Sequence, residues 1–314
     1  MSRILDLQEK LQDTSAAIAE FERAVAHEPD SVSLAAMLKS FAKRKQQLED
    51  DFRSTAADIG TDVCRYRFFS DSRRPTVSPL CAALAEFQSL FSVAYDAVKN
   101  GPKRQSRKLP PEVVDQSSFY FGYSFSGSVG IVMTFDNNVR SLFESSLDEA
   151  MLAIVDIAQA RASDEIISKG KRLGVPGVRA LHRWAARHVE AAMGAEIEWQ
   201  KGHETKARLL AQLPDLRQLV SAIDNATEII EEESDEIGRL AGADVTKRTF
   251  HLELADQHDI RGSFAETISP TQTFEVGRRY QVTLRRRIKV FYSTDVEEDV
   301  SFQLIAASPI VDGQ

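Results

Sequence analysis

The spacing of apolar residues changes from a helical repeat near the start of this chain to strict alternation near its end. Over the first 28 residues, six apolar side chains occupy a and d positions of one heptad frame: Ile4, Leu7, Leu11, Ile18, Phe21 and Val25. From 280 to 292 every second residue is apolar or aromatic, except Arg286. The first pattern is typical of helices and the second of strands. The chain is therefore predicted to be an α+β protein.

An antiparallel helical hairpin is expected over residues 1–62. Pro29 interrupts the first helical pattern, and Ser31 is suited to cap a second helix. Three apolar residues of that second helix repeat every seven positions: Leu34, Phe41 and Leu48. A heptad stripe needs a partner helix. Two alternatives follow: an arm that packs on its own protein, or an oligomerisation surface formed by the stripe of the first helix.

Residues 63–241 are expected to form a mostly helical domain around one β-hairpin. Apolar residues have helical spacing over 79–98, 147–158 and 178–193. Ser146-Leu-Asp-Glu149 has the pattern of a capping box, which predicts that the second of these helices begins at Ser146. Residues 118–135 change to period two, with Ser126-Gly127 as the turn, which predicts the hairpin. A long helix is predicted over 214–241 because four residues repeat every seven positions: Leu216, Ile223, Ile230 and Ile237.

The aromatic residues of the predicted hairpin alternate along its first strand: Phe119, Phe121, Tyr123 and Phe125. Such a row is more often the apolar face of a sheet, covered by helices, than a surface on which nucleic-acid bases stack. We expect it to belong to the core.

Residues 242–314 are predicted to form a small β domain of about five short strands, closed as an SH3-like or OB-like barrel. Alternation along its longest strand places three cations on one face: Arg285, Arg287 and Lys289. These cations would contact an anionic partner, or they would form a solvated face balanced by carboxylates on adjacent strands, for which Glu253, Glu266 and Glu275 are candidates.

The net charge of −8 hides a basic region, because residues 63–110 carry nine basic and three acidic side chains. Five of the basic residues lie within ten positions that contain no acid: Lys99, Lys103, Arg104, Arg107 and Lys108. The segment contains the helix stop Asn100-Gly101-Pro102 and is closed by Pro110, so it is predicted to be an exposed loop. It is either a solvated connector or a phosphate-binding segment.

No pattern in the sequence predicts a catalytic site, a bound cofactor or a metal site. Cys64 and Cys81 are too few for a disulfide scaffold or a cysteine zinc site, which indicates a reducing, cytoplasmic location. We expect no membrane partner, because no apolar run reaches the length of about 20 residues that crosses a bilayer. Ser124 and Ser126 lie near glycines, but a nucleophile elbow must turn into a helix, so a serine hydrolase is the least favoured function.

Two segments, Ser-Phe-Tyr-Phe-Gly-Tyr-Ser-Phe-Ser-Gly-Ser-Val at 118–129 and Tyr-Gln-Val-Thr-Leu at 280–284, are similar to segments of uncharacterised bacterial proteins, some of them linked to phage defence. This resemblance implies a bacterial subunit of a larger system and carries no residue roles. We expect a non-enzymatic interaction or assembly protein, whose partner is another protein or a second copy of itself. The alternative is a subunit that binds nucleic acid through the 99–108 loop and the 285–289 strand.

Overall fold

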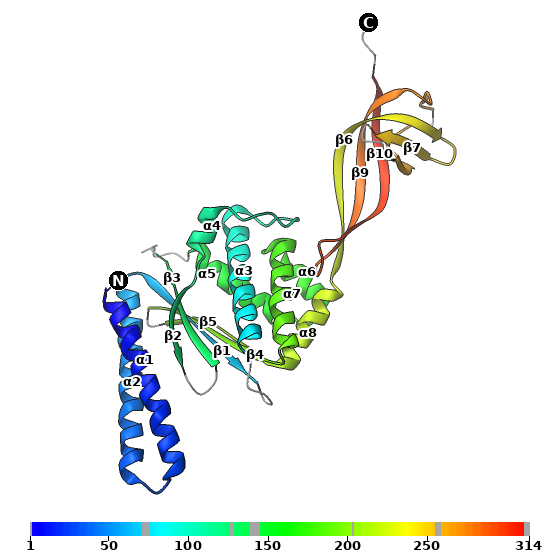
Figure 1. The fold of residues 1–314 in the computed structure, drawn as a ribbon. Coiled ribbons are helices and arrows are strands. Elements are labelled where there is room, and N and C mark those ends of the chain that lie inside the picture. The colour runs from blue at the N-terminus through cyan, green and yellow to red at the C-terminus, as the bar shows by residue number, and fades with distance from the viewer. Residues whose placement is uncertain are drawn as a thin grey trace. The chain divides into compact units, whose positions relative to one another are not determined.

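The computed structural model describes residues 2–70, 76–125, 129–137, 145–202, 204–254, 259–269 and 271–310 (Figure 1). The chain divides into two units, Met1–Ala226 (unit 1) and Thr227–Gln314 (unit 2). Both helices and sheets are present, which confirms the predicted α+β class. The boundary expected between 241 and 242 falls inside a strand, β6 (Thr227–Asp244).

Unit 1 combines eight described helices with one antiparallel sheet. The helices are α1 (Ser2–His27), α2 (Val32–Asp58), α3 (Val77–Asn100), α4 (Pro111–Gln116), α5 (Ser146–Ala158), α6 (Ser163–Gly170), α7 (Gly174–Glu190) and α8 (Leu213–Asp224). The strands are β1 (Thr61–Phe69), β2 (Tyr120–Phe125), β3 (Val129–Asp136), β4 (Gly194–Lys201) and β5 (Glu204–Ala211). They pair in the order β2-β3-β1-β4-β5. The expectation of a mostly helical region around a single hairpin was therefore wrong.

One face of this sheet is covered by α3, α5 and α7 (Figure 1). Strand β1 illustrates how side chains alternate between this covered face and the opposite face of the sheet. Cys64, Tyr66 and Phe68 are buried and alternate with more exposed arginines. The Tyr66 ring lies 5.0 Å from that of Phe87 on α3, and the Trp184 indole of α7 donates a 2.8 Å hydrogen bond to the Tyr66 hydroxyl. The core of unit 1 therefore lies between the sheet and these helices.

Among the described residues, α3 alone is long and apolar enough to cross a membrane by length and composition, which differs from the expectation. Its buried face carries Phe87, Leu90 and Phe91, and the rings of both phenylalanines stack on Phe119. The same helix buries Asp96, whose carboxylate pairs with a lysine of the following loop. This is the packing of a core helix.

The predicted hairpin is present as β2 and β3, but its aromatic row does not share one face. The register shifts between Phe121 and Tyr123, where Gly122 is inserted as a bulge. A Cβ atom at Gly122 would lie 2.8 Å from the Val132 carbonyl oxygen, so only glycine fits there. As a result Phe121 is 57 % exposed whereas Tyr123 is buried. The predicted turn at 126–127 lies outside the described residues.

The prediction of one long helix over 214–241 was wrong, because α8 ends at Asp224 and residues 227–244 form β6. Asn225 closes α8, and its side-chain amide donates a 2.7 Å bond to the Ser221 carbonyl oxygen. From Thr227 to Arg239, β6 pairs with β9 (Arg279–Phe291) over thirteen residues. Long-range pairing with a basic strand overrides the heptad spacing of this acidic segment.

In unit 2, β6 and β9 share one sheet with β7 (Thr249–Leu254), β8 (Asp259–Phe264) and β10 (Glu297–Pro309). The five strands close on themselves in the order β10-β8-β7-β6-β9. Their interior is one apolar cluster, which includes Leu240, Phe250, Leu252, Phe264, Tyr280, Val282, Leu284 and Leu304. The alternating apolar positions of β9 therefore face the core. Arg286 breaks this row and pairs with Asp299 of β10.

Candidate functional site

The base of the helical arm formed by α1 and α2 is anchored on the sheet of unit 1. Its apolar cluster joins residues of both helices to β1, β2 and β3: Leu7, Leu11, Phe52, Ala56, Val63, Tyr123 and Val132. Gln8 also donates a 3.2 Å bond to the Phe121 carbonyl oxygen. The first members of the predicted oligomer stripe are therefore covered by their own chain.

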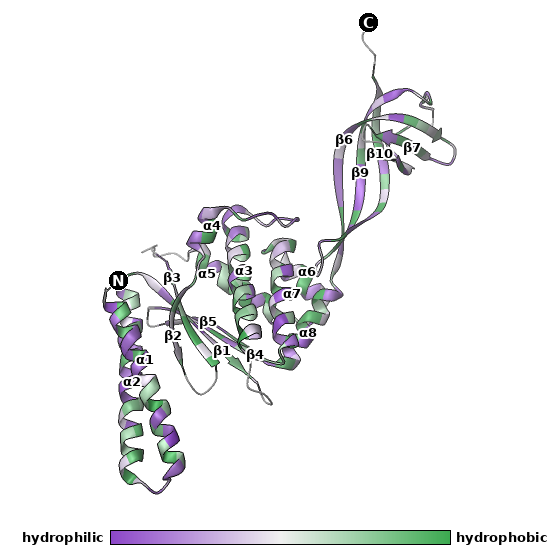
Figure 2. Ribbon diagram, viewed as in Figure 1, coloured by the Kyte–Doolittle hydropathy of each residue, from purple (hydrophilic) through white to green (hydrophobic). Residues whose placement is uncertain are grey.

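The distal half of the arm, residues 19–48, contains no fully buried residue. Its main contact is between the two helices, where the Phe21 and Phe41 rings lie 5.1 Å apart. Of the predicted stripe, Leu7, Leu11 and Ile18 are buried, whereas Ile4, Phe21 and Val25 are only half-buried. Apolar residues nevertheless continue to the end of both helices, as Figure 2 shows. The distal half thus keeps apolar surface in contact with water.

The two helices of the distal arm have opposite charge. Residues 16–28 carry three acidic side chains and one basic side chain, and residues 32–47 carry four basic side chains and no acidic one. The acidic residues are Glu20, Glu22 and Glu28; the basic residues of the second segment are Lys39, Lys43, Arg44 and Lys45. Within the described part of the chain, none of these seven side chains takes part in an ion pair.

The basic segment at 99–108 begins in the last turn of α3, is irregular from residue 101 onward, and has partners in its own chain for most of its cations. Lys99 donates a 2.8 Å bond to the Gln116 side chain, and Lys103 pairs with Asp96 at 2.5 Å. Arg104 also has a partner. The exposed cations of this segment are Lys99, Arg107 and Lys108. The loop is thus tied to α3 at its start and open to solvent at its end.

The basic row on β9 lies beside the acidic strand β6, in a segment whose heptad spacing predicted a helix. Arg285 donates a 2.8 Å bond to Glu233 of β6, and Arg287 lies 3.5 Å from Glu231. The hydrogen bond to Glu233 raises the pKa of Arg285. Lys289 lies over the Phe291 ring, 4.9 Å from its centroid. The carboxylates that balance the two arginines therefore come from residues 231–233, and not from the expected glutamates.

A serine hydrolase would need a histidine beside Ser124 or Ser126, but the two histidines of α7, His182 and His188, contact other groups. His182 lies 2.9 Å from Asp224, and the imidazole of His188 lies 2.6 Å from the Tyr66 hydroxyl. Ser124 lies on β2, and Ser126 lies outside the described residues. The geometry thus joins neither histidine to Ser124.

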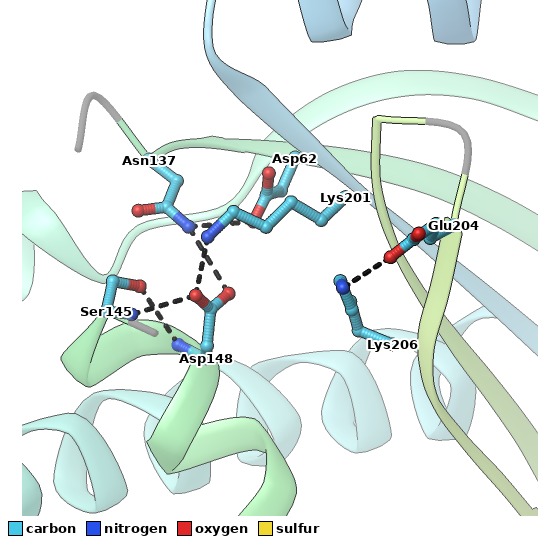
Figure 3. A network of polar contacts seen from close by, with 7 residues as sticks. All are labelled: Asp62, Asn137, Ser145, Asp148, Lys201, Glu204 and Lys206. Carbon is cyan, nitrogen blue, oxygen red and sulfur yellow. Dashed lines mark hydrogen bonds and ion pairs between the residues drawn. The ribbon is translucent and has the colours of Figure 1, made fainter. Parts of the chain in front are cut away.

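A buried polar cluster, which the sequence did not predict, lies where α5 begins beside the sheet (Figure 3). Asn137 donates bonds of 2.8 Å to Asp62 and 3.4 Å to Asp148. Lys201, at the end of β4, pairs with Asp148 at 2.5 Å. Ser145 and Asp148 exchange backbone-to-side-chain bonds of 2.9 and 3.2 Å, which form a capping box for α5. The cluster therefore fixes the first turn of α5 to two strand ends.

Burial raises the pKa of Asp62 in this cluster to about 6, against the lowering effects of the Asn137 bond and of Lys201. The side-chain oxygen of Asn137 is also buried and has no hydrogen-bond partner among the described residues. A carboxyl that titrates near neutral pH is suited to proton transfer. Asp62 is only 3 % exposed, however, so we interpret the cluster as structural. The one sequence signal for it is the capping box, which was predicted one residue too late, at Ser146.

Comparison of the chain with protein-family models, with curated proteins and with solved structures finds no match.

Proposed function

We propose that this chain is a non-enzymatic assembly protein and that the distal half of its helical arm pairs with the arm of a second copy. The supporting observation is that residues 19–48 are not fully buried although both helices continue their apolar stripes. Two helices cannot enclose two stripes by themselves, and most helical stability in proteins comes from packing of the apolar face. Two further helices would complete a four-helix bundle.

The charges of the distal arm favour a second copy as the occupant. An antiparallel pair of arms can set the acidic α1 segment of one copy against the basic α2 segment of the other. Charge complementarity of this kind directs partner choice. Because the charged side chains of this half form no ion pair within the described chain, they are available to a neighbour.

Charge reversal tests the proposal. The variants Lys43→Glu/Arg44→Glu and Glu20→Lys/Glu22→Lys change exposed residues of the distal arm, so both should fold. Each alone should self-associate at least about tenfold more weakly than the wild type, because like charges then face each other. An equimolar mixture should associate more strongly than either variant. Sedimentation velocity of the full chain measures all three.

The control variant Lys171→Glu/Arg217→Glu makes the same charge change as Lys43→Glu/Arg44→Glu, at exposed residues of unit 1 outside the arm. It should associate as the wild type does. If both arm variants behave like this control, the arm is not the interface.

The other expected features are part of the proposal. We assign the closed five-stranded sheet of unit 2 to an SH3-like or OB-like barrel, by analogy with folds that present a contact surface to a partner. We place the protein in the cytoplasm of a bacterium, as a subunit of a larger system with a role in phage defence. Imaging of a tagged full chain tests the cytoplasmic location. Identification of the neighbouring genes tests the role in a larger defence system.

Nucleic-acid binding by the basic loop and the basic strand is the second candidate. Arg107 and Lys108 support it, because both are exposed. Arg285 and Arg287 support it less, because both lie against glutamates of β6. Affinity that depends on phosphate contacts should fall steeply with salt. We expect a low-salt filter-binding titration to show no retention of DNA or RNA; salt-sensitive retention would move this candidate ahead.

A further inference from the structure

The face of the unit 1 sheet opposite α3, α5 and α7 contains a charged hollow. Six side chains from four strands line a cavity of about 240 Å³: Arg65, Arg67, Phe125, Glu196, Glu198 and Arg208. The strand register brings them together. Glu198 of β4 lies between Arg65 of β1 and Arg208 of β5, and Glu196 lies opposite Arg67. Alternation places all of these charged residues on the face away from the core.

Both carboxylates of the hollow already have partners. Glu196 pairs with Arg67 at 2.5 Å on one side and with Arg208 at 2.5 Å on the other, and its side chain is only 13 % exposed. Burial raises the pKa of Glu196, but the bonds from the two arginines outweigh it and hold the pKa below its usual range. Glu198 accepts bonds of 2.5 Å from the Gln200 side chain and 3.0 Å from Thr205.

Arg65 differs from the other two arginines of the hollow, because it forms no ion pair within the described chain. Its guanidinium lies over the Phe125 ring, 5.0 Å from the centroid, and not against Glu198. The ring is held there because Gly130 lies beneath it: a Cβ atom at Gly130 would be 2.1 Å from the ring carbons. Stacking on an aromatic ring fixes a guanidinium while its in-plane N–H donors stay free.

We propose that this hollow binds an oxyanion, the phosphate or carboxylate group of a small molecule, with Arg65 as its principal contact. Three guanidinium groups and two carboxylates leave one net positive charge around the cavity. The carboxylates are satisfied within the chain, whereas the guanidinium N–H donors of Arg65 have no partner among the described residues. A guanidinium binds phosphate or carboxylate oxygens through two parallel N–H bonds. Arg67 and Arg208 contribute positive charge while Glu196 fixes their positions.

Two-dimensional NMR of the arginine Nε–H groups of the full chain tests this site. Inorganic phosphate and acetate are titrated separately, and sodium chloride at matched ionic strength corrects for screening. The Arg65 signal, assigned by its loss in Arg65→Gln, should shift saturably with at least one of the two anions. The stronger of the two responses shows whether the site prefers a tetrahedral or a planar oxyanion. Shifts no larger than those caused by chloride, for both anions, would overturn the proposal.

Two variants add controls that do not depend on the signal of Arg65 itself. Arg65→Lys keeps the charge but loses the planar group, and the affinity measured at the Arg67 and Arg208 signals should fall about tenfold, as for loss of one charged hydrogen bond. Arg183→Gln removes an exposed arginine of α7 that pairs with Glu86, and should leave the affinity unchanged. Equal affinities of Arg65→Lys and the wild type would contradict the role of Arg65.

Discussion

At the scale of single residues, unit 1 buries two titratable side chains whose pKa shifts have opposite effects on stability. Burial raises the pKa of Asp62 from 3.8 to about 6 and lowers that of His188 from 6.5 to about 4. Stability contributed by Asp62 is therefore lost as pH rises from 3.8 through 6, and stability contributed by His188 is lost as pH falls from 6.5 through 4. The two effects offset each other over the same pH range in the wild-type protein.

Asp62→Asn should stabilise unit 1 at neutral pH, because it removes a charge that is costly to bury. The gain in unfolding free energy should be roughly 1.5 kcal/mol larger at pH 7.5 than at pH 5. Urea denaturation at the two pH values measures this difference. Asp115→Asn, which changes an exposed carboxylate of α4, is the control and should show no such pH dependence. A gain that is equal at both pH values would show that Asp62 is not buried in its charged form.

His188→Gln should show the reverse dependence. The variant loses the contact with the Tyr66 hydroxyl, so it is less stable than the wild type at pH 7.5. The deficit should shrink by roughly 2 kcal/mol at pH 5, because the wild-type imidazole then resists a proton that the unfolded chain accepts. The same urea titrations measure it, with the exposed His27→Gln as control. A deficit that does not shrink at pH 5 would contradict burial of a neutral imidazole.

The roles of single residues could be predicted only where the local sequence pattern identified the correct secondary structure. The pairing of Arg285 and Arg287 with carboxylates was foreseen as an alternative, but its partners were not, because Glu231 and Glu233 lie in a segment predicted to be helical. Arg65 and Glu196 lie in short strands, β1 and β4, in which polar and apolar residues alternate. These stretches are too short for their alternation to be distinguished from the helical spacing of the neighbouring segments. The hollow that these residues line could therefore not be found without the sheet.

At the scale of elements, the structure and the sequence-based prediction place the start of α5 at different serines. Ser145, and not Ser146, accepts the backbone bond that caps the helix. Ser145→Ala should therefore cost about 1 kcal/mol of unfolding free energy, as is usual for loss of an N-cap. Ser146→Ala lies inside the first turn and should change stability by less than about 0.5 kcal/mol. Chemical denaturation of both variants measures the difference; a larger loss from Ser146→Ala would support the capping box predicted from the sequence.

Helices and strands were predictable where the spacing of apolar residues agrees with the way the element packs. They were not predictable where pairing with a distant strand determines the secondary structure. Helix α3 and strands β2 and β3 lie where periodicity predicted them. Strand β6 does not, because its heptad spacing is coincidental and its state depends on β9, about fifty residues later in the chain. A strand whose charges are balanced only across the sheet carries no local sign of its partner.

At the scale of the whole molecule, the net charge of −8 is the sum of acidic and basic surfaces that differ in whether their charges are paired. In unit 2 the basic strand lies between acidic strands and its arginines are paired there. In unit 1 the distal arm carries charged side chains that form no ion pair within the described chain, acidic on α1 and basic on α2. Local complementarity within the arm, more than the total charge, therefore directs the proposed association.

Sedimentation equilibrium of the full wild-type chain over a range of concentrations tests the proposed arm-to-arm assembly most directly. The mass should rise from one chain, 35.0 kDa, toward twice that value with increasing concentration. The rise should weaken at high salt, because screening reduces attraction between the exposed charges of the two arms. A mass of 35.0 kDa at every concentration, at low salt as well as at high salt, would contradict the assembly of two copies.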